Sequence, residues 1–248
     1  MKQAALRWAV PATALFLIFV LMTLPARHVW GWLVDGQLAA QDIQGTLWSG
    51  RATRVVHPAF SAGPLVWQLR PQALLLGRLE YQVFVQSEAG GGELQAGIGV
   101  FAGRYIKDAH LTQPVADLAR RLSNNLLGLD GDFQIDLDEL RLSADSIATL
   151  QGVLVWRDAR VVQPSAMALG HVRMQLTLRD GRVVGTLGDE GGPLEVTGEV
   201  LIGMDRAYQL DAQLKPRANA DANLRQSLEL LGVPDRQGRY RVQYSGKL

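Results

Sequence analysis

The stretch LEYQVFVQ, residues 79–86, alternates apolar side chains at 79, 81, 83 and 85 with Glu80, Gln82, Phe84 and Gln86, of which Phe84 alone is apolar. An alternation of period two is typical of a β-strand that has one face buried and the other in water. The pattern returns in FQIDLD (133–138), MQLTLR (174–179) and YQLDAQLK (208–215). These stretches predict a mainly β fold of half-buried antiparallel strands.

Turn signals separate the strands. Asp180-Gly181 stands between Arg179 and Arg182 and predicts a two-residue hairpin, because glycine tolerates a positive φ. The glycine-rich runs at 90–92 and 191–193 predict two further turns.

Two segments break the alternation and are expected to be short helices. Residues 114–127 and 219–231 carry leucines at helical spacing, and a glycine follows each of them. For the second helix, Asn219 or Asp221 is the expected N-cap.

The exported part of the sequence contains matches between its two halves. IQGTL (43–47) resembles LQGVL (150–154), and further leucine and glycine matches follow in the same order at a slowly increasing offset. We interpret these matches as two internal repeats, 42–140 and 149–248, each with several strands, a short helix and a closing strand. Chance matching is the alternative. Because no Pro/Ser-rich linker separates the halves, we expect one continuous curved antiparallel sheet.

The N-terminal region predicts a membrane anchor. Residues 8–26 hold no charged side chain, and a helix of this length would span roughly 28 Å, close to the hydrocarbon core of a bilayer. Lys2 and Arg7 precede it, so residues 1–7 are expected in the cytoplasm and the rest of the chain in the periplasm.

A cleaved signal peptide is the competing interpretation of this region. Leu24 would stand at position −3 of a site after Ala26, which disfavours cleavage and favours a retained anchor. Residues 27–41 then form a juxtamembrane segment. Three tryptophans, Trp8, Trp30 and Trp32, are predicted to lie at the membrane interface.

Composition excludes several classes of protein. A net charge of +1 gives no field that would attract nucleic acid. The chain has no cysteine, and its four histidines are far apart in the sequence, so we expect no catalytic residues, no metal site and no cofactor. The acidic run at 130–136 resembles the start of a calcium loop, but Ile135 stands where that loop requires glycine.

Together these features resemble the protein N family of the bacterial type II secretion system, the general secretion pathway. The residues that carry the resemblance are the single anchor, QGTLWSG (44–50), LQGVLVWRDA (150–159) and LLGVPDRQGRY (230–240) with the ending YSG (244–246). The resemblance implies a protein of the cell inner membrane with a periplasmic β domain. It implies that other secretion components are its partners, that folded proteins are exported, and that catalysis is absent.

The alternative function belongs to a different class. An anchored antiparallel sheet with one apolar face resembles the β-grooves of envelope lipid-transfer proteins, which would bind a lipid or another hydrophobic ligand. A groove of that kind exposes its apolar lining, whereas a scaffold would cover it with the two helices.

The two closing strands differ on their water-facing side. Arg239 and Arg241 stand where the first repeat carries Asp132 and Gln134. If the last strand is an exposed edge, these arginines are candidate partner-binding residues. The alternative is that both water-facing sides are merely solvated.

Overall fold

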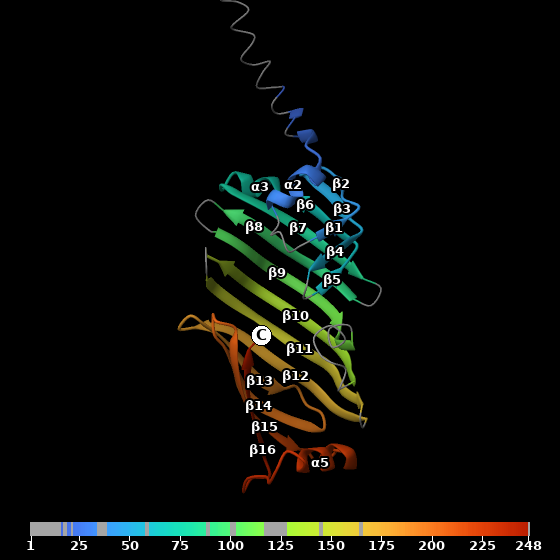
Figure 1. Ribbon diagram of the computed structural model, residues 1–248, viewed down its shortest axis with the longest axis vertical. Helices are drawn as coiled ribbons and strands as arrows, with labels where there is room; N and C mark the ends of the chain where they lie inside the picture. The colour runs from blue at the N-terminus through green and yellow to red at the C-terminus, as the bar shows by residue number, and fades with distance from the viewer. Residues whose placement is uncertain are drawn as a thin grey trace, which may run out of the picture.

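The structure is a computed structural model. It describes residues 16, 19, 20, 22–33, 39–57, 60–87, 90–99, 103–116, 128–143, 146–163 and 166–247. Within these ranges the chain forms one long antiparallel sheet, one small sheet and short helices (Figure 1).

The long sheet has 13 strands, in the spatial order β16-β15-β14-β13-β12-β11-β10-β9-β8-β7-β6-β3-β2. Its strands are β2 (Gln44–Gly45), β3 (Ser49–Ala52), β6 (Leu65–Leu69), β7 (Arg78–Ser87), β8 (Gly90–Gly99), β9 (Gly103–Pro114), β10 (Gly128–Leu142), β11 (Ile147–Gln163), β12 (Met167–Arg179), β13 (Arg182–Asp189), β14 (Leu194–Ile202), β15 (Ala207–Pro216) and β16 (Tyr240–Lys247). The small sheet joins β1 (Ala39–Gln41), β4 (Arg54–His57) and β5 (Phe60–Ala62). The described helices are α2 (Ala26–Leu33), α3 (Pro71–Leu74) and α5 (Ala222–Glu229).

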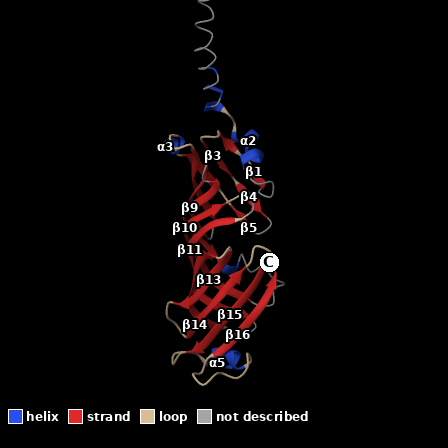
Figure 2. Cartoon of the chain, turned by 90° about the vertical axis from the view of Figure 1, so that its left-hand side faces the viewer, coloured by secondary structure: helices blue, strands red, loops and turns tan. Residues whose placement is uncertain are grey.

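From β6 to β16 every strand pairs with its neighbour in the sequence, so the sheet is a meander. The molecule is elongated along the direction in which the strands succeed one another, and the sheet twists along that length (Figures 1 and 2). The helices α2 and α3 lie at one end, and α5 lies at the other.

Each end of the sheet has its own hydrophobic cluster. At the α5 end, Leu224 and Leu228 of the helix are buried against Leu194, Val196 and Tyr240. At the other end, the cluster consists of Ala26, Ala52, Val55 and Trp67. Helix α5 thus packs on one end of the sheet, and Ala26 of α2 packs on the other.

The predicted mainly β fold, with a large antiparallel sheet, is confirmed. The four alternating stretches lie in β7, β10, β12 and β15, and Asp180-Gly181 forms the hairpin between β12 and β13 with φ values of 50° and 71°. Both values suit a type I′ turn, whose twist matches that of the flanking strands. The turn at 191–193 also lies where the glycines predict it, between β13 and β14.

The turn predicted at 90–92 is wrong, because these residues begin strand β8 and pair with β7. A Cβ atom at Gly92 would overlap the carbonyl oxygen of His110 on the next strand. Glycine is therefore required here by a close approach of two strands.

The helix predicted at 219–231 is present as α5, and Asp221 is its N-cap, with its carboxylate accepting a hydrogen bond from the Leu224 amide at 2.7 Å. Of the helix predicted at 114–127, only Val115 and Ala116 are described as helical, and residues 117–127 lie outside the described part of the chain.

Most of the predicted anchor at 8–26 also lies outside the described residues. Phe16, Phe19, Val20 and residues 22–23 are helical. Among the residues that the structure describes, no helix is both long enough and apolar enough to cross a membrane.

Internal duplication stays a prediction. In the second half β13, β14 and β15 precede α5 and β16, and in the first half β7, β8 and β9 precede Val115 and β10. The halves also differ, because the small sheet and α3 of the first half have no counterpart among the described elements of the second. At the predicted boundary, 141–148, the long sheet is continuous, since β10 pairs with β11.

Candidate functional site

One row of residues runs across the long sheet from β3 to β16 and is apolar at every strand. Directly opposed residues of an antiparallel pair lie on the same face. The row consists of Ala52, Leu65, Val85, Gly92, Leu111, Ile135, Leu154, Met174, Leu187, Gly198, Ala212 and Val242. We call the face that carries it the apolar face.

The apolar face is not sealed along its whole length. Its large side chains from Leu111 to Met174 are half-buried, and they belong to neither of the two buried clusters at the ends of the sheet. Beside them Phe133 and Trp156 are in ring contact at 5.8 Å between centroids. Within the described residues, the centre of the apolar face thus keeps part of its hydrocarbon surface accessible.

From β8 to β16 the opposite face is mostly polar. Each residue one position along from the apolar row belongs to a second row. From β8 to β16 this row consists of Glu93, His110, Asp136, Val153, Gln175, Thr186, Glu199, Asp211 and Gln243. We call this surface the polar face, and most of the charges in this row are carboxylates.

A charged cluster around Glu80 lies on the polar face near the α3 end. The Glu80 carboxylate contacts Arg70 Nη1 at 2.8 Å and Lys107 Nζ at 3.0 Å, and it accepts a hydrogen bond from the Tyr105 hydroxyl at 2.7 Å. Glu80 is only 4% exposed and is the one buried charged residue among those described. Arg70 also donates a hydrogen bond to Gln95. The cluster therefore joins β7, β8 and β9 to the residue before α3.

The environment of this cluster changes the acidity of its members. Burial alone would raise the pKa of Glu80, but the hydrogen bonds from Tyr105 and Lys107 and the charges of Lys107 and Arg70 outweigh it, so the pKa is lowered. Burial, together with the hydrogen bond to Glu80, raises the pKa of Tyr105 to about 12. Glu80 is therefore held as a carboxylate and Tyr105 as a neutral donor, which describes a structural ion cluster.

Farther along the polar face, His110 Nδ1 lies 2.8 Å from the Asp136 carboxylate. That hydrogen bond raises the pKa of His110. His110 is exposed, and the pair is therefore a solvent-facing part of the polar row.

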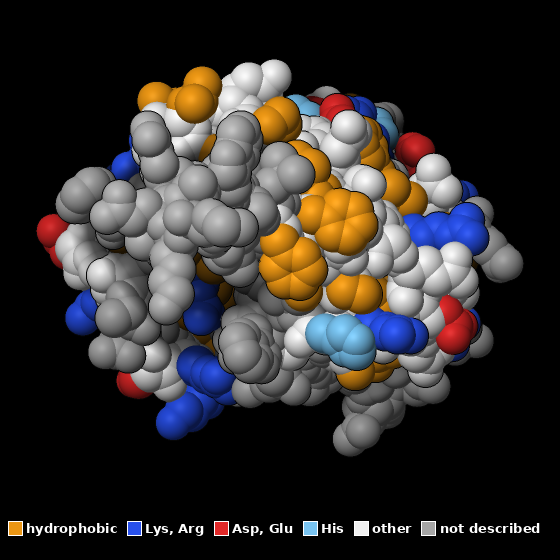
Figure 3. All heavy atoms as spheres, turned by 90° about the horizontal axis from the view of Figure 1, so that it is seen from above, with side chains coloured by type: hydrophobic (Ala, Val, Ile, Leu, Met, Phe, Trp, Pro, Cys, Tyr) orange, Lys and Arg blue, Asp and Glu red, His pale blue; other side chains and the backbone are white. Residues whose placement is uncertain are grey.

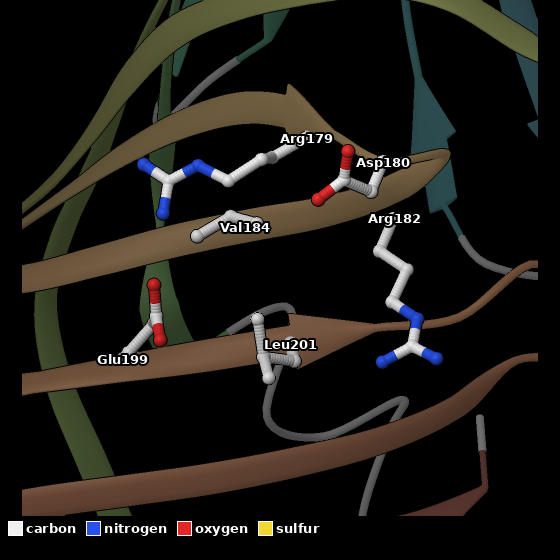
Figure 4. A pocket seen from close by; sticks show the side chains of 6 residues that line it. All are labelled: Arg179, Asp180, Arg182, Val184, Glu199 and Leu201. Atoms are coloured by element: carbon white, nitrogen blue, oxygen red, sulfur yellow. The ribbon is translucent and has the colours of Figure 1, made fainter.

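The polar face is hollowed at the hairpin of β12 and β13. A pocket of about 380 Å³ is lined there by Arg179, Asp180, Arg182, Val184, Glu199 and Leu201 (Figure 4). A second pocket, which shares Glu199 and Leu201, extends over β15 and β16 to Asp211 and Gln243. Neither lining contains a histidine, and the titratable groups that both offer include carboxylates.

The described residues hold no cluster of three or more His, Asp or Glu side chains that could bind a metal ion. The long sheet has two extended surfaces. One consists of hydrocarbon, and the other consists mostly of hydrogen-bonding and acidic groups. Such surfaces suit binding.

Strand β16 is the edge of the long sheet, as the partner-binding prediction for Arg239 and Arg241 requires. Both arginines already have intramolecular partners: Arg239 Nε lies 2.9 Å from Asp235, and Arg241 Nε lies 3.0 Å from Asp211 on β15. The sequence does not predict these pairings. The first depends on the conformation of the turn before β16, and the second depends on the register of β15 and β16. Binding of a partner by the two arginines stays a prediction.

The three tryptophans predicted at the membrane interface are only partly described. Trp30 lies on α2 and packs against Trp67, with ring centroids 5.7 Å apart. Trp8 and the side chain of Trp32 lie outside the described part of the chain. Their interfacial position stays a prediction.

A long antiparallel sheet with short helices at its ends defines a mainly β protein with one apolar and one mostly polar face. The comparisons with known proteins identify its family. The model of type II secretion system (T2SS), protein N, matches residues 36–243, and the chain therefore belongs to this family.

Curated relatives cover most of the chain. The "Type II secretion system protein N" of Aeromonas hydrophila is 29% identical and aligned over 100% of both chains. The protein of the same name from Vibrio cholerae serotype O1 is 30% identical over 85% of each chain. The one from Pectobacterium carotovorum is 20% identical over 93% of this chain and 92% of its own. No solved structure matches the chain.

The predicted resemblance is thus confirmed, and membership of the family supports a role in the type II secretion system.

Proposed function

We propose that this chain is a non-enzymatic component of the type II secretion apparatus. In this proposal residues 8–26 anchor it in the cell inner membrane, and its β domain works in the periplasm, together with other secretion components, in moving folded proteins across the outer membrane. The observation that carries the proposal is the family match over residues 36–243.

The topology is supported by the sequence around the anchor. Lys2 and Arg7 precede the apolar stretch, and positive residues favour the cytoplasmic side. A phosphatase reporter fused after Leu248 is then expected to be active, and an inactive fusion would contradict the periplasmic location.

The non-enzymatic role is supported by the chemistry of the described surfaces. The buried ion cluster holds Glu80 ionised and Tyr105 neutral, and the linings of the two pockets contain carboxylates and no histidine. The polar face instead offers a long row of hydrogen-bonding groups, which suits contacts with folded proteins.

Deletion of the gene tests the function. Proteins that the apparatus secretes are expected to reach the periplasm, fold and remain there, and a plasmid copy should restore their release. The measurement is the distribution of one secreted enzyme between periplasm and medium. Unchanged release by the deletion strain would contradict the proposal.

A second candidate function is favoured by one observation, the partly accessible centre of the apolar face. A groove that binds lipid or another hydrophobic ligand would use the row through Leu111, Ile135, Leu154 and Met174. About 25 cal/mol is gained per Å² of hydrocarbon removed from water, so an acyl chain covering this row would bind favourably.

Photocrosslinking separates the two candidates. A photoreactive residue at Leu154 would label lipid if the groove is used, whereas the same residue at Gln175 on the polar face should not. Adducts are identified by mass spectrometry of the purified full chain. Equal labelling at the two positions, or none at Leu154, would exclude the groove.

A further inference from the structure

The turn that follows β6 exposes three consecutive leucines. Leu74 is 42% exposed, Leu75 is 89% exposed and Leu76 is 72% exposed. Removing a leucine side chain from water is favourable, so leaving three of them exposed is costly unless something covers them.

This turn is held firmly by the sheet. The Arg70 amide donates to the carbonyl oxygen of Glu80 at 2.8 Å, and the Arg70 side chain joins the buried Glu80 cluster. After the leucines, the Gly77 amide donates to the Leu74 carbonyl at 3.0 Å, and Ala73 is buried beneath the turn. Hydrogen bonds and an ion pair therefore fix the backbone on both sides of the leucines. Their exposure is a property of the folded chain.

The turn lies at the end of the molecule where the N-terminal segment joins the sheet. Leu24 and Pro25, at the end of that segment, are tied to the turn between β2 and β3, since the Leu47 amide donates to the Leu24 carbonyl at 3.0 Å. The helices α2 and α3 both lie at this end in Figures 1 and 2. Figure 3, which looks onto this end, shows hydrophobic side chains gathered there with charged ones of both signs around them.

The apolar side chains described up to Met22 in the segment that leads to this end are exposed. Phe16, Phe19 and Met22 are each more than half exposed. The leucine turn and this segment thus expose hydrocarbon at the same end, while Arg70 and Arg78 flank the turn. Arg70 is already paired with Glu80, so Arg78 is the basic residue beside the turn that the interface of an anionic bilayer would accept together with the hydrocarbon.

We propose that the leucine turn, residues 74–76, inserts into the surface of the membrane that holds the anchor, so that the sheet is fixed to the bilayer at a second point. The inference rests on the proposed anchor at 8–26. A single helix alone would let the β domain swivel, whereas a second contact fixes the direction in which the long sheet extends away from the membrane.

The chain lacks cysteine, so one introduced cysteine gives a single labelling site. We would label the full chain at Phe19→Cys, Leu75→Cys or Leu230→Cys with an environment-sensitive fluorophore and reconstitute it in vesicles of phosphatidylcholine and phosphatidylglycerol. Leu230 is the matched control, because it is 85% exposed and follows α5 at the opposite end. Circular dichroism checks that each variant is folded.

Labels at Phe19→Cys and Leu75→Cys are expected to emit at shorter wavelength and to lose fluorescence when the lipids carry brominated acyl chains, while the label at Leu230→Cys stays in water. A quenched Phe19→Cys label beside an aqueous Leu75→Cys label would overturn the inference and leave the anchor standing. Aqueous labels at both would overturn the anchor as well. Quenching at all three positions would overturn the assignment to this end.

Discussion

Two tyrosines at the α3 end of the sheet differ in how their hydroxyl groups are satisfied. Tyr105 donates to the Glu80 carboxylate at 2.7 Å. The Tyr81 hydroxyl is buried and is the one such side-chain atom without a hydrogen-bond partner among the described residues; its burial raises the pKa of Tyr81 to about 12. A buried polar group without a partner reduces stability, whereas one bonded to a charge contributes to it.

The same substitution at these two positions should therefore change the free energy of unfolding differently. We expect Tyr105→Phe to lower the free energy of unfolding by about 1–3 kcal/mol, because a hydrogen bond to a charged group is lost. Tyr81→Phe should leave that free energy unchanged or raise it by up to about 1 kcal/mol. Denaturant titration of both variants measures the difference, and a loss at Tyr81→Phe as large as that at Tyr105→Phe would contradict the assignment.

The stability contributed by Glu80 should depend on pH. The pKa of Glu80 is lowered below its ordinary value of 4.5 in the folded chain, so ionised Glu80 stabilises the fold above that value and the contribution disappears as the pH falls through the folded pKa. Glu80→Gln is expected to cost roughly 1–3 kcal/mol at pH 7 and progressively less below about pH 4.5.

The control is Glu93→Gln on β8, whose side chain is exposed on the same face. It should change the unfolding free energy little at any pH. Unfolding curves for the three proteins between pH 3 and pH 7, about the range over which a carboxylate titrates, give the comparison. A deficit of Glu80→Gln that stays constant with pH would show that Glu80 acts through packing alone.

Alternation in the sequence places Glu80 on the water-facing side, and it gives no sign that this residue is buried. The cover comes from Arg70, Tyr105 and Lys107, of which the nearest is 10 residues away in the chain. Such long-range partners depend on strand register, which a period-two pattern leaves open.

At the scale of elements, alternation locates the long strands and the hairpin at Asp180-Gly181, because each is determined by neighbouring residues. It fails where a strand bulges. Lys107 and His110 are three positions apart yet lie on one face, since Asp108 has a φ of 47° and adds a residue to β9. The sequence shows which residues of one strand share a face. Which residues of different strands lie opposite one another in the apolar and polar rows follows only from the strand register.

The partner-binding prediction for Arg239 and Arg241 belongs to edge strand β16. Edge strands expose unpaired backbone groups, and charged side chains protect them from unwanted pairing. If Arg239 and Arg241 also contact an acidic partner surface, Arg239→Glu with Arg241→Glu should leave folding nearly unchanged and weaken co-purification with the secretion apparatus, most strongly at low salt.

The matched control for the arginine pair is Asp132→Lys with Asp136→Lys on β10, which should weaken co-purification less. Reversal of Arg241 also places a carboxylate beside Asp211, so folding is checked by thermal unfolding of both variants. Unchanged co-purification and secretion in the arginine variant would leave the two residues as edge protection only.

At the scale of the whole molecule, the sheet is built from nearest-neighbour pairings. Every strand from β6 to β16 contacts the strands beside it in the sequence, and the buried clusters lie at the two ends. An architecture in which each unit contacts only its neighbours approaches the one-dimensional behaviour of repeat proteins, in which a local defect spreads over a short distance. In a long sheet of this kind, the apolar and polar faces extend over many strands, and each end is stabilised by its own buried cluster.

Matched substitutions at the two ends should therefore have separate effects. Leu228 of α5 and Leu69 of β6 are 4% and 5% exposed, and truncation of a buried leucine to alanine costs about 2–5 kcal/mol. We expect Leu228→Ala to speed amide hydrogen exchange in β14 to β16 and to leave β6 to β8 protected, and Leu69→Ala to do the reverse. Hydrogen exchange read by mass spectrometry of peptides from each strand measures both patterns. If either variant sped exchange equally at the two ends, the sheet would be one cooperative unit, and the separation of its two ends would be wrong.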